Sequence, residues 1–148
     1  MLSRLIYRSK AALISPSDIS DILRVSQTNN AVRGITGAML FSDGWFVQYL
    51  EGGQSALDRL QVSLRADARH SDVRQLDSGY TSSRIFTAWS MTLVEWDQGT
   101  KHLLEVFLGS DAASLERLSG TDIAAMFRAL SLGGYIRSFP GSHPSNLP

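Results

Sequence analysis

The first side chain that could bind a ligand is Gln48, a carboxamide within an otherwise apolar run. The run WFVQYL, residues 45–50, is apolar on both faces except for Gln48. A strand that is apolar on both faces is typically central and covered, so we expect Gln48 to be buried. A buried amide needs partners for its two donors and its acceptor. Gln48 therefore bonds a neighbouring side chain, lies at the edge of the cover, or contacts a ligand.

A predicted helix carries a second polar group on the face that should be buried. Its buried stripe begins with Ile19, Ile22 and Leu23. At helical spacing the stripe continues with Ser26, Asn29 and Asn30, so it turns polar in its last turn. A single asparagine is explained by a helix end, where Asn favours the left-handed cap conformation. Two asparagines and a serine are less well explained in that way.

The third polar side chain is Tyr7, in the first predicted strand. A core tyrosine with its hydroxyl at the rim is the usual explanation. If the helix packs on the two strands, however, Tyr7, Gln48 and the asparagines converge into a neutral hydrogen-bonding cluster. Such a cluster suits a planar heterocycle with alternating C=O and N–H groups better than it suits a charged substrate.

The second predicted helix ends in a basic segment that contains Arg65, Arg69 and His70. Basic residues near a helix C-terminus complement the helix dipole, so a solvated helix end explains this segment. The alternative is an anion contact for a phosphate tail that reaches the surface.

Trp89 and Met91 lie two residues apart in a predicted strand and therefore share a face. Core packing is the first explanation for such a pair. Because methionine tolerates alternative packings, the pair is also a plausible switchable contact.

The elements that must position these side chains alternate along the chain. Apolar runs, an Asp-Gly turn at 43–44 and helical periodicity predict the order βαββαβ, with an additional strand and terminal helices. This order favours a ferredoxin-like α+β fold, in which an antiparallel-rich sheet has two helices on one face. The predicted strands are 2–8, 36–41, 45–51, 73–80 and 89–96, and the predicted helices are 15–29, 55–68, 100–107 and 121–132.

Composition excludes several kinds of site. The 148 residues include 14 Lys and Arg, 14 Asp and Glu, and no cysteine. A zero net charge is unfavourable for non-specific nucleic-acid binding, and the lack of cysteine excludes disulfides, thiolate metal sites and cysteinyl adducts. The three histidines show no metal-ligand spacing. No apolar run is long enough for a membrane span and no signal peptide is recognisable, so we expect a cytoplasmic protein.

Five segments, in this order along the chain, resemble the BLUF domain, the blue-light sensor that uses FAD. They are RLIYRS at 4–9, SQTNNAVRGITGAML at 26–40, FVQYLEG at 46–52, DARHSDV at 67–73 and RIFTAWSM at 84–91. The resemblance covers about residues 2 to 95. It implies a flavin-binding domain over 1–96, with 97–137 as its C-terminal helical extension and 138–148 as a flexible tail.

The resemblance also implies roles for the residues singled out above. Tyr7 corresponds to the redox-active tyrosine and Gln48 to the switching glutamine. Asn30 corresponds to the asparagine that bonds the flavin pyrimidine edge, and Asn29, with Ser26 on the same stripe, is a further polar contact.

Arg69 and His70 correspond to the segment near the flavin and its ribityl-phosphate side, and Arg65 to a basic contact that varies in the family. Trp89 and Met91 correspond to the residues that carry the signal. Light would drive electron and proton transfer from Tyr7, and Gln48 would then exchange its hydrogen bonds, with no covalent bond formed.

The leading hypothesis is therefore a non-catalytic photoreceptor that binds FAD, signals to a separate protein and associates with itself. A light-insensitive flavin-binding or protein-interaction module is the alternative. A small hydrolase or transferase on the same fold is a third, but no supported nucleophile with an acid–base pair is evident. Neither a nucleic acid nor a membrane is expected as a partner.

Overall fold

The computed structural model describes residues 1–11, 15–42, 44–67, 70–87, 91–94, 102, 106, 119–132 and 136–137. The predicted ferredoxin-like α+β order is confirmed, because the first six elements follow the order βαββαβ. The elements are β1 (Leu2–Ala11), α1 (Pro16–Arg33), β2 (Thr36–Ser42), β3 (Trp45–Gly53), α2 (Gln54–Ala66), β4 (His70–Tyr80), β5 (Thr92–Val94), α4 (Gly120–Leu132) and β6 (Ile136–Arg137).

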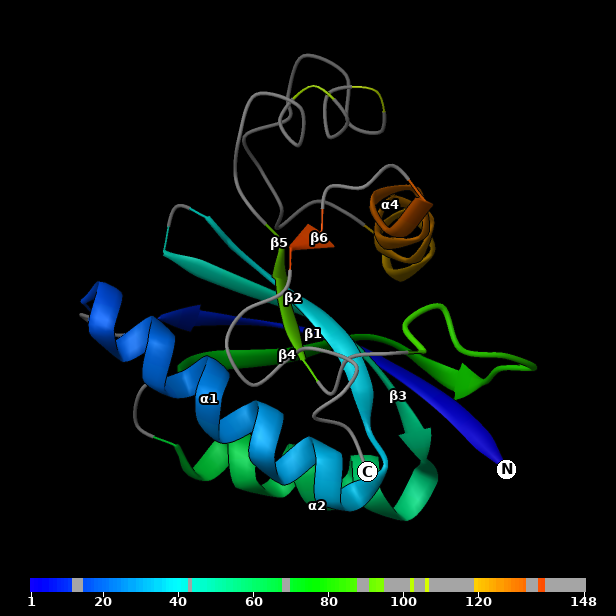
Figure 1. Ribbon diagram of the computed structural model, residues 1–148, viewed down its shortest axis with the longest axis horizontal. Coiled ribbons are helices and arrows are strands. Elements are labelled where there is room, and N and C mark those ends of the chain that lie inside the picture. The colour runs from blue at the N-terminus through cyan, green and yellow to red at the C-terminus, as the bar shows by residue number, and fades with distance from the viewer. Residues whose placement is uncertain are drawn as a thin grey trace.

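One six-stranded sheet, with strand order β4-β1-β3-β2-β5-β6, runs through the molecule (Figure 1). All neighbouring strands are antiparallel except β2 and β5, which are parallel. The central pair β1 and β3 is in a register that sets Tyr7 directly opposite Gln48. Two polar residues far apart in the sequence are thereby neighbours on one face of the sheet.

Local signals position α1. Ser15 caps the helix in a capping box, in which the Asp18 amide donates to the Ser15 hydroxyl at 3.3 Å and the Ser15 amide donates to the Asp18 carboxylate at 2.8 Å. The helix ends at Gly34, whose φ of 69° is a left-handed conformation that glycine adopts without strain. The predicted end at residue 29 was wrong. Asn29 and Asn30 lie inside the helix, so capping does not explain them.

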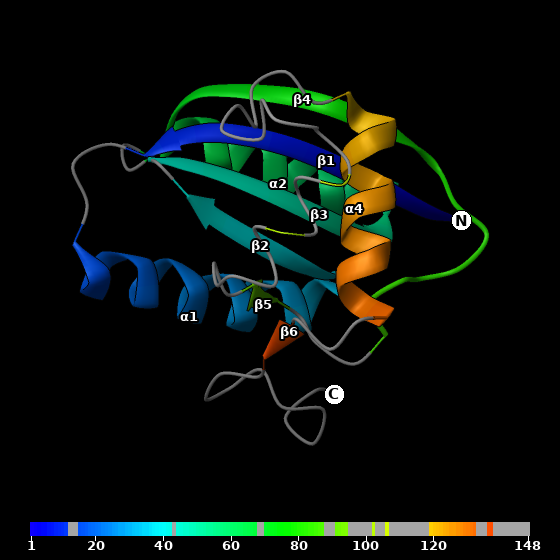
Figure 2. The same cartoon turned by 90° about the horizontal axis from the view of Figure 1, so that it is seen from above.

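The two faces of the sheet pack against different helices. Helices α1 and α2 cover one face and α4 lies on the other (Figure 1), and the view from above shows α4 across the strands (Figure 2). Residues 5 and 7 of β1 join the core under α1 and α2, whereas Ile6 joins the core under α4. This alternation is the side-chain period of a strand, so β1 supplies both cores.

Differences from the predicted elements lie mainly in the C-terminal third. Strand β5 is Thr92–Val94 rather than 89–96, and the two-residue strand β6 was not predicted. The predicted helix 100–107 lies outside the described residues except for positions 102 and 106, and the tail 138–148 lies outside them entirely. Among the helices that the structure describes, none is both long and apolar enough to cross a membrane.

Candidate functional site

A cleft opens between α1, α2 and the face of the sheet that these helices cover. Its lining includes six residues that the sequence singled out: Tyr7, Ser26, Asn29, Asn30, Gln48 and Met91. The other lining residues are Ile22, Val25, Leu60, Ser63, Leu64 and Asp67. The polar residues predicted to converge from the first strand, the third strand and the first helix thus share one hollow.

Tyr7 and Gln48 form the floor of this cleft. Only 2% of Tyr7 and 3% of Gln48 is exposed. Neither side chain makes a hydrogen bond to any residue that the structure describes. Because both residues line the cleft, their hydroxyl and amide groups are available to a ligand that carries hydrogen-bonding groups.

Burial also controls the protonation of Tyr7. Loss of solvent raises the pKa of the Tyr7 phenol well above its usual value, and the negative charge of Asp67 raises it further. The phenol is therefore a neutral hydrogen-bond donor at physiological pH. Asp67 itself follows α2 and lines the cleft, although the sequence analysis gave it no individual role.

Helix α1 contributes the polar wall. Asn30 is fully buried, Ser26 is half-buried and Asn29 is exposed at the mouth. The helix continues to Arg33, so these residues project from a rigid element and not from a fraying end. Apolar residues of both helices, Ile22 of α1 and Leu64 of α2, complete the walls.

Gln27 is a buried site residue that sequence reasoning missed. Its side-chain amide donates to the backbone carbonyl of Met91 at 3.2 Å, and only 4% of the residue is exposed. Met91 is also buried and lines the cleft. The bond ties α1 to the segment that enters β5. Position 27 lies four residues after Leu23 on the buried stripe, and that spacing is the signal that could have found it.

The basic residues after α2 are only partly described. Arg65 is exposed, does not line the cleft, and donates to the Val73 carbonyl of β4 at 3.4 Å, so its cofactor contact stays a prediction. Arg69 and Trp89 lie outside the described residues. His70 begins β4 opposite Ala11, and its side chain is likewise outside the description.

The chemistry of the lining fits a flat heteroaromatic group. Apolar side chains from two helices can cover the faces of a ring, while amides, a phenol and a carboxylate can meet its polar edge. The Tyr7 hydroxyl and the Gln48 amide, which have no hydrogen-bond partner among the described residues, supply both donors and acceptors. Among the described residues, no group of three or more His, Asp or Glu side chains is placed so that it could hold a metal ion.

Comparison with known proteins agrees with this geometry. The chain matches the family BLUF, "Sensors of blue-light using FAD", over residues 2–92. Photoactivated adenylate cyclase subunit beta of Euglena gracilis is 34% identical over 108 residues, which are 72% of this chain and 12% of that protein. The alpha subunit is 41% identical over 86 residues, 57% of this chain and 8% of that protein. The chain therefore spans a small fraction of these relatives.

Solved structures show the same architecture over most of the chain. The photo-activated state of BlsA superposes with a TM-score of 0.81 at 25% identity, covering 89% of this chain and 96% of BlsA. The dark state of BlrB, a BLUF protein, superposes with a TM-score of 0.73 at 34% identity, with the same coverage of 89% and 96%. Every cleft residue named above lies within residues 2–92, and the chain belongs to the BLUF family of blue-light sensors that use FAD.

Proposed function

We propose that the cleft between α1, α2 and the sheet holds FAD without a covalent bond, and that Tyr7 and Gln48 are its photoactive pair. One observation supports this assignment above all. The two residues are register partners on neighbouring central strands, both are buried, and neither side chain is hydrogen-bonded within the described part of the chain. Both residues line the cleft, so a bound ligand could supply the hydrogen bonds that the described residues do not.

The remaining lining would bind and orient the ring system. Asn30, Asn29 and Ser26 would hydrogen-bond its polar edge, and Ile22 and Leu64 would cover its faces and exclude water. On the sequence resemblance alone, we assign Arg69 and His70, with Arg65 nearby, to the ribityl-phosphate side of the cofactor.

When bound, the flavin supplies blue-light absorption and a transient acceptor for one electron. Tyr7 would give up that electron, after which its phenolic proton is acidic enough to move to the oxygen of the neighbouring Gln48 amide. The Gln48 amide would then rotate or tautomerise, so that its donor and acceptor positions are exchanged when the electron and proton return to Tyr7. No covalent attachment is needed, in keeping with a chain that has no cysteine.

The output of such a switch is small and local. One exchanged hydrogen bond is worth about 1 kcal/mol, which biases a pre-existing equilibrium and does not rebuild the fold. We propose that the bias passes through Met91, which lines the cleft, to the residues after β5 and from there to a separate protein. Trp89 would take part in this step by the same resemblance.

The test is the absorption spectrum of the flavin-loaded protein in the dark and after blue light. We expect a slight red shift that recovers in the dark. Tyr7→Phe and Gln48→Leu should keep the flavin and lose the shift. Tyr49→Phe is a matched control, because Tyr49 is adjacent to Gln48 on β3 but belongs to the core on the opposite face.

Three other outcomes would contradict the proposal in distinguishable ways. A protein that binds flavin but shows no shift is a light-insensitive flavin-binding module. A protein that stays colourless when FAD is supplied is an interaction module. A shift that survives in both Tyr7→Phe and Gln48→Leu would place the photoactive pair elsewhere.

A further inference from the structure

A second cavity, of about 280 Å³, lies on the face of the sheet opposite the cleft. Three arginines from three separate elements line it: Arg4 of β1, Arg84 of the connection after β4, and Arg128 of α4. The rest of the described lining is five hydroxyl-bearing side chains and one isoleucine, and none of these described residues is acidic. Guanidinium and hydroxyl groups donate hydrogen bonds to an oxyanion, whereas a carboxylate would repel it.

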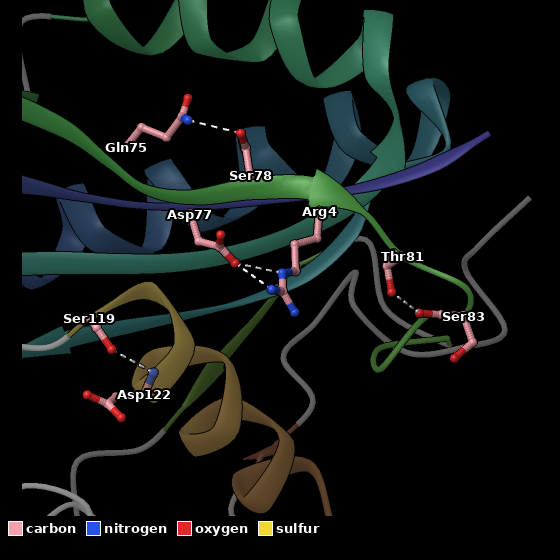
Figure 3. Close-up of polar contacts among 8 residues, drawn as sticks. All are labelled: Arg4, Gln75, Asp77, Ser78, Thr81, Ser83, Ser119 and Asp122. Atoms are coloured by element: carbon pink, nitrogen blue, oxygen red, sulfur yellow. Dashed lines mark hydrogen bonds and ion pairs between the residues drawn. The ribbon is translucent and has the colours of Figure 1, made fainter.

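Arg4 and Arg84 are held in place by neighbours in different ways. Arg4 donates from Nε to the Asp77 carboxylate at 2.8 Å, and both side chains lie on the side of the sheet that faces α4 (Figure 3). Arg84 donates to neutral acceptors, the Thr36 hydroxyl at 2.8 Å and the carbonyls of Glu51 at 2.9 Å and Gly34 at 2.8 Å. These bonds fix the Arg84 guanidinium, whose charge also interacts with the buried Glu51 carboxylate.

Within the part of the chain that the structure describes, the carboxylates near the cavity are fewer than its three arginines. Asp77 pairs with Arg4. Glu51 is fully buried, and its carboxylate accepts from the backbone amides of Ile85 at 2.7 Å and Phe86 at 3.0 Å. Arg128 is exposed and makes no ion pair with any residue that the structure describes. Among the described residues, two carboxylates therefore accompany three arginines, and Arg128 at the open side of the cavity is the arginine without one.

We propose that this cavity is a binding site for a small phosphate-bearing ligand. The guanidinium of Arg128, together with the hydroxyls of Ser82 and Ser83, offers directed donors around one volume. The size suits inorganic phosphate or the phosphate end of a small phosphoester. The site is separate from the flavin cleft and does not depend on the photochemistry proposed above.

The position of the cavity gives the ligand a means to act on the sensor. One wall is the connection 81–85, which Glu51 and Arg84 fix to the sheet and which leads toward Met91 at the cleft. The other wall is α4, which carries Arg128. A bound phosphate would bridge these two walls, so it would hold the connection and α4 in one arrangement.

Titration of the flavin-loaded protein in the dark with inorganic phosphate, against chloride at matched ionic strength, tests the site. Backbone amide resonances in NMR spectra report where the anion binds. We expect saturable shifts at 81–85 and at 128–131, with the amides of Asn29 and Asn30 unchanged. Arg128→Gln should weaken binding by about tenfold or more, as for the loss of one hydrogen bond to a charged group.

Arg24→Gln is the matched control, because Arg24 is an exposed arginine on α1, on the other side of the sheet. It should leave phosphate binding unchanged. A parallel titration with glycerol 3-phosphate distinguishes a phosphoester ligand from the free phosphate ion. If glycerol 3-phosphate binds more tightly than inorganic phosphate, the ligand is a phosphoester; if the two bind equally, it is the free ion. Either result supports the site.

Two results would overturn the proposal. The first is a response no larger than that to chloride, and the second is shifts confined to the end of α2 and the cleft, where the phosphates of FAD are expected. Binding of a phosphopeptide without binding of either small probe would also overturn it, in favour of a protein-docking surface. A protein without a light-induced shift leaves this test unaffected, since the titration is done in the dark.

Discussion

Strand β3 presents buried polar side chains to both faces of the sheet. The two faces differ in the hydrogen-bond partners that they offer to these side chains. Toward α4, Glu51 accepts two backbone hydrogen bonds, and Tyr49 packs against Phe86 and Phe127 at ring-centroid distances of 5.6 and 5.8 Å. Toward α1 and α2, Gln48 makes no side-chain hydrogen bond within the described residues and faces a cleft. A buried polar group with partners stabilises a fold, whereas one without them marks a ligand site.

The largest expected effect breaks the packed face. Phe127→Ala removes an α4 ring that is fully buried against Tyr49 and Phe86, and should lower the free energy of unfolding by about 3–5 kcal/mol. Denaturant unfolding measures the loss. Ile22→Ala on the cleft face should cost less when FAD is absent. Because Ile22 lines the cleft, added FAD should then stabilise Ile22→Ala less than it stabilises Phe127→Ala or the wild type. Equal costs without FAD and equal stabilisation by FAD would show that the two faces do not differ.

The second prediction concerns the two hydrogen bonds by which the Glu51 carboxylate of β3 holds the connection after β4. Glu51→Gln places an amide donor where a carboxylate accepts from the Ile85 and Phe86 amides, leaving one of them buried without an acceptor. We expect a loss of about 1–3 kcal/mol in unfolding free energy and faster hydrogen exchange at these two amides. Asp58→Asn, at an exposed position on α2, should change stability by less than about 0.5 kcal/mol. Unchanged hydrogen exchange at the Ile85 and Phe86 amides in Glu51→Gln would show that the Glu51 carboxylate does not hold the connection in place.

A smaller effect is expected on the cleft face. Gln27→Leu leaves the buried Met91 carbonyl without its donor, and should cost about 1 kcal/mol while flavin is retained. The dark recovery of the light-induced shift should change in rate, because the segment entering β5 is no longer tied to α1. Thr28→Ala removes only an exposed bond within the same helix and serves as the control. If the absorption shift recovers in the dark at the same rate in Gln27→Leu and in the wild type, the bond to Met91 has no part in the switch.

The smallest expected effect appears at alkaline pH. Burial, reinforced by the charge of Glu51 and opposed by Arg4, raises the pKa of Tyr49 from 10.0 to about 12. A raised folded-state pKa means that the unfolded chain loses this proton first, so the stabilisation is complete below pH 10 and is lost as the pH rises toward 12. Unfolding free energy measured across this range should fall less steeply in Tyr49→Phe. Since burial also raises the pKa of Tyr7, Tyr7→Phe should reduce the remaining slope, and a slope unaffected by either change would contradict both shifts.

Local sequence patterns predicted the elements well and their ends less well. The Ser15 capping box begins α1 where expected, because the cap is a contact among residues within three positions. The end of α1 was misplaced because Asn29 is an acceptable cap in isolation, while Gly34 supplies the better left-handed residue four positions beyond Asn30. Strand β6 was missed because two residues carry no periodicity, and only pairing with β5 makes them a strand.

The candidate cleft was predictable to the extent that its residues break a local pattern. Gln48 interrupts an apolar run and the asparagines interrupt an apolar stripe, so both are visible without a structure. Gln27 and Asp67 do not visibly interrupt an apolar pattern. Their place in the site depends on the residues that they contact in the folded chain.

The sequence by itself determined the kinds of element, the family motifs and the buried polar residues that needed an explanation. The tertiary structure alone decided which of those residues have partners. It set Tyr7 opposite Gln48 through the β1–β3 register, and gathered Arg4, Arg84 and Arg128 around one cavity from positions far apart in the chain. The physical reason is that patterns of 2 and 3.6 residues specify a face within an element, whereas partners across elements depend on register and packing that no single segment contains.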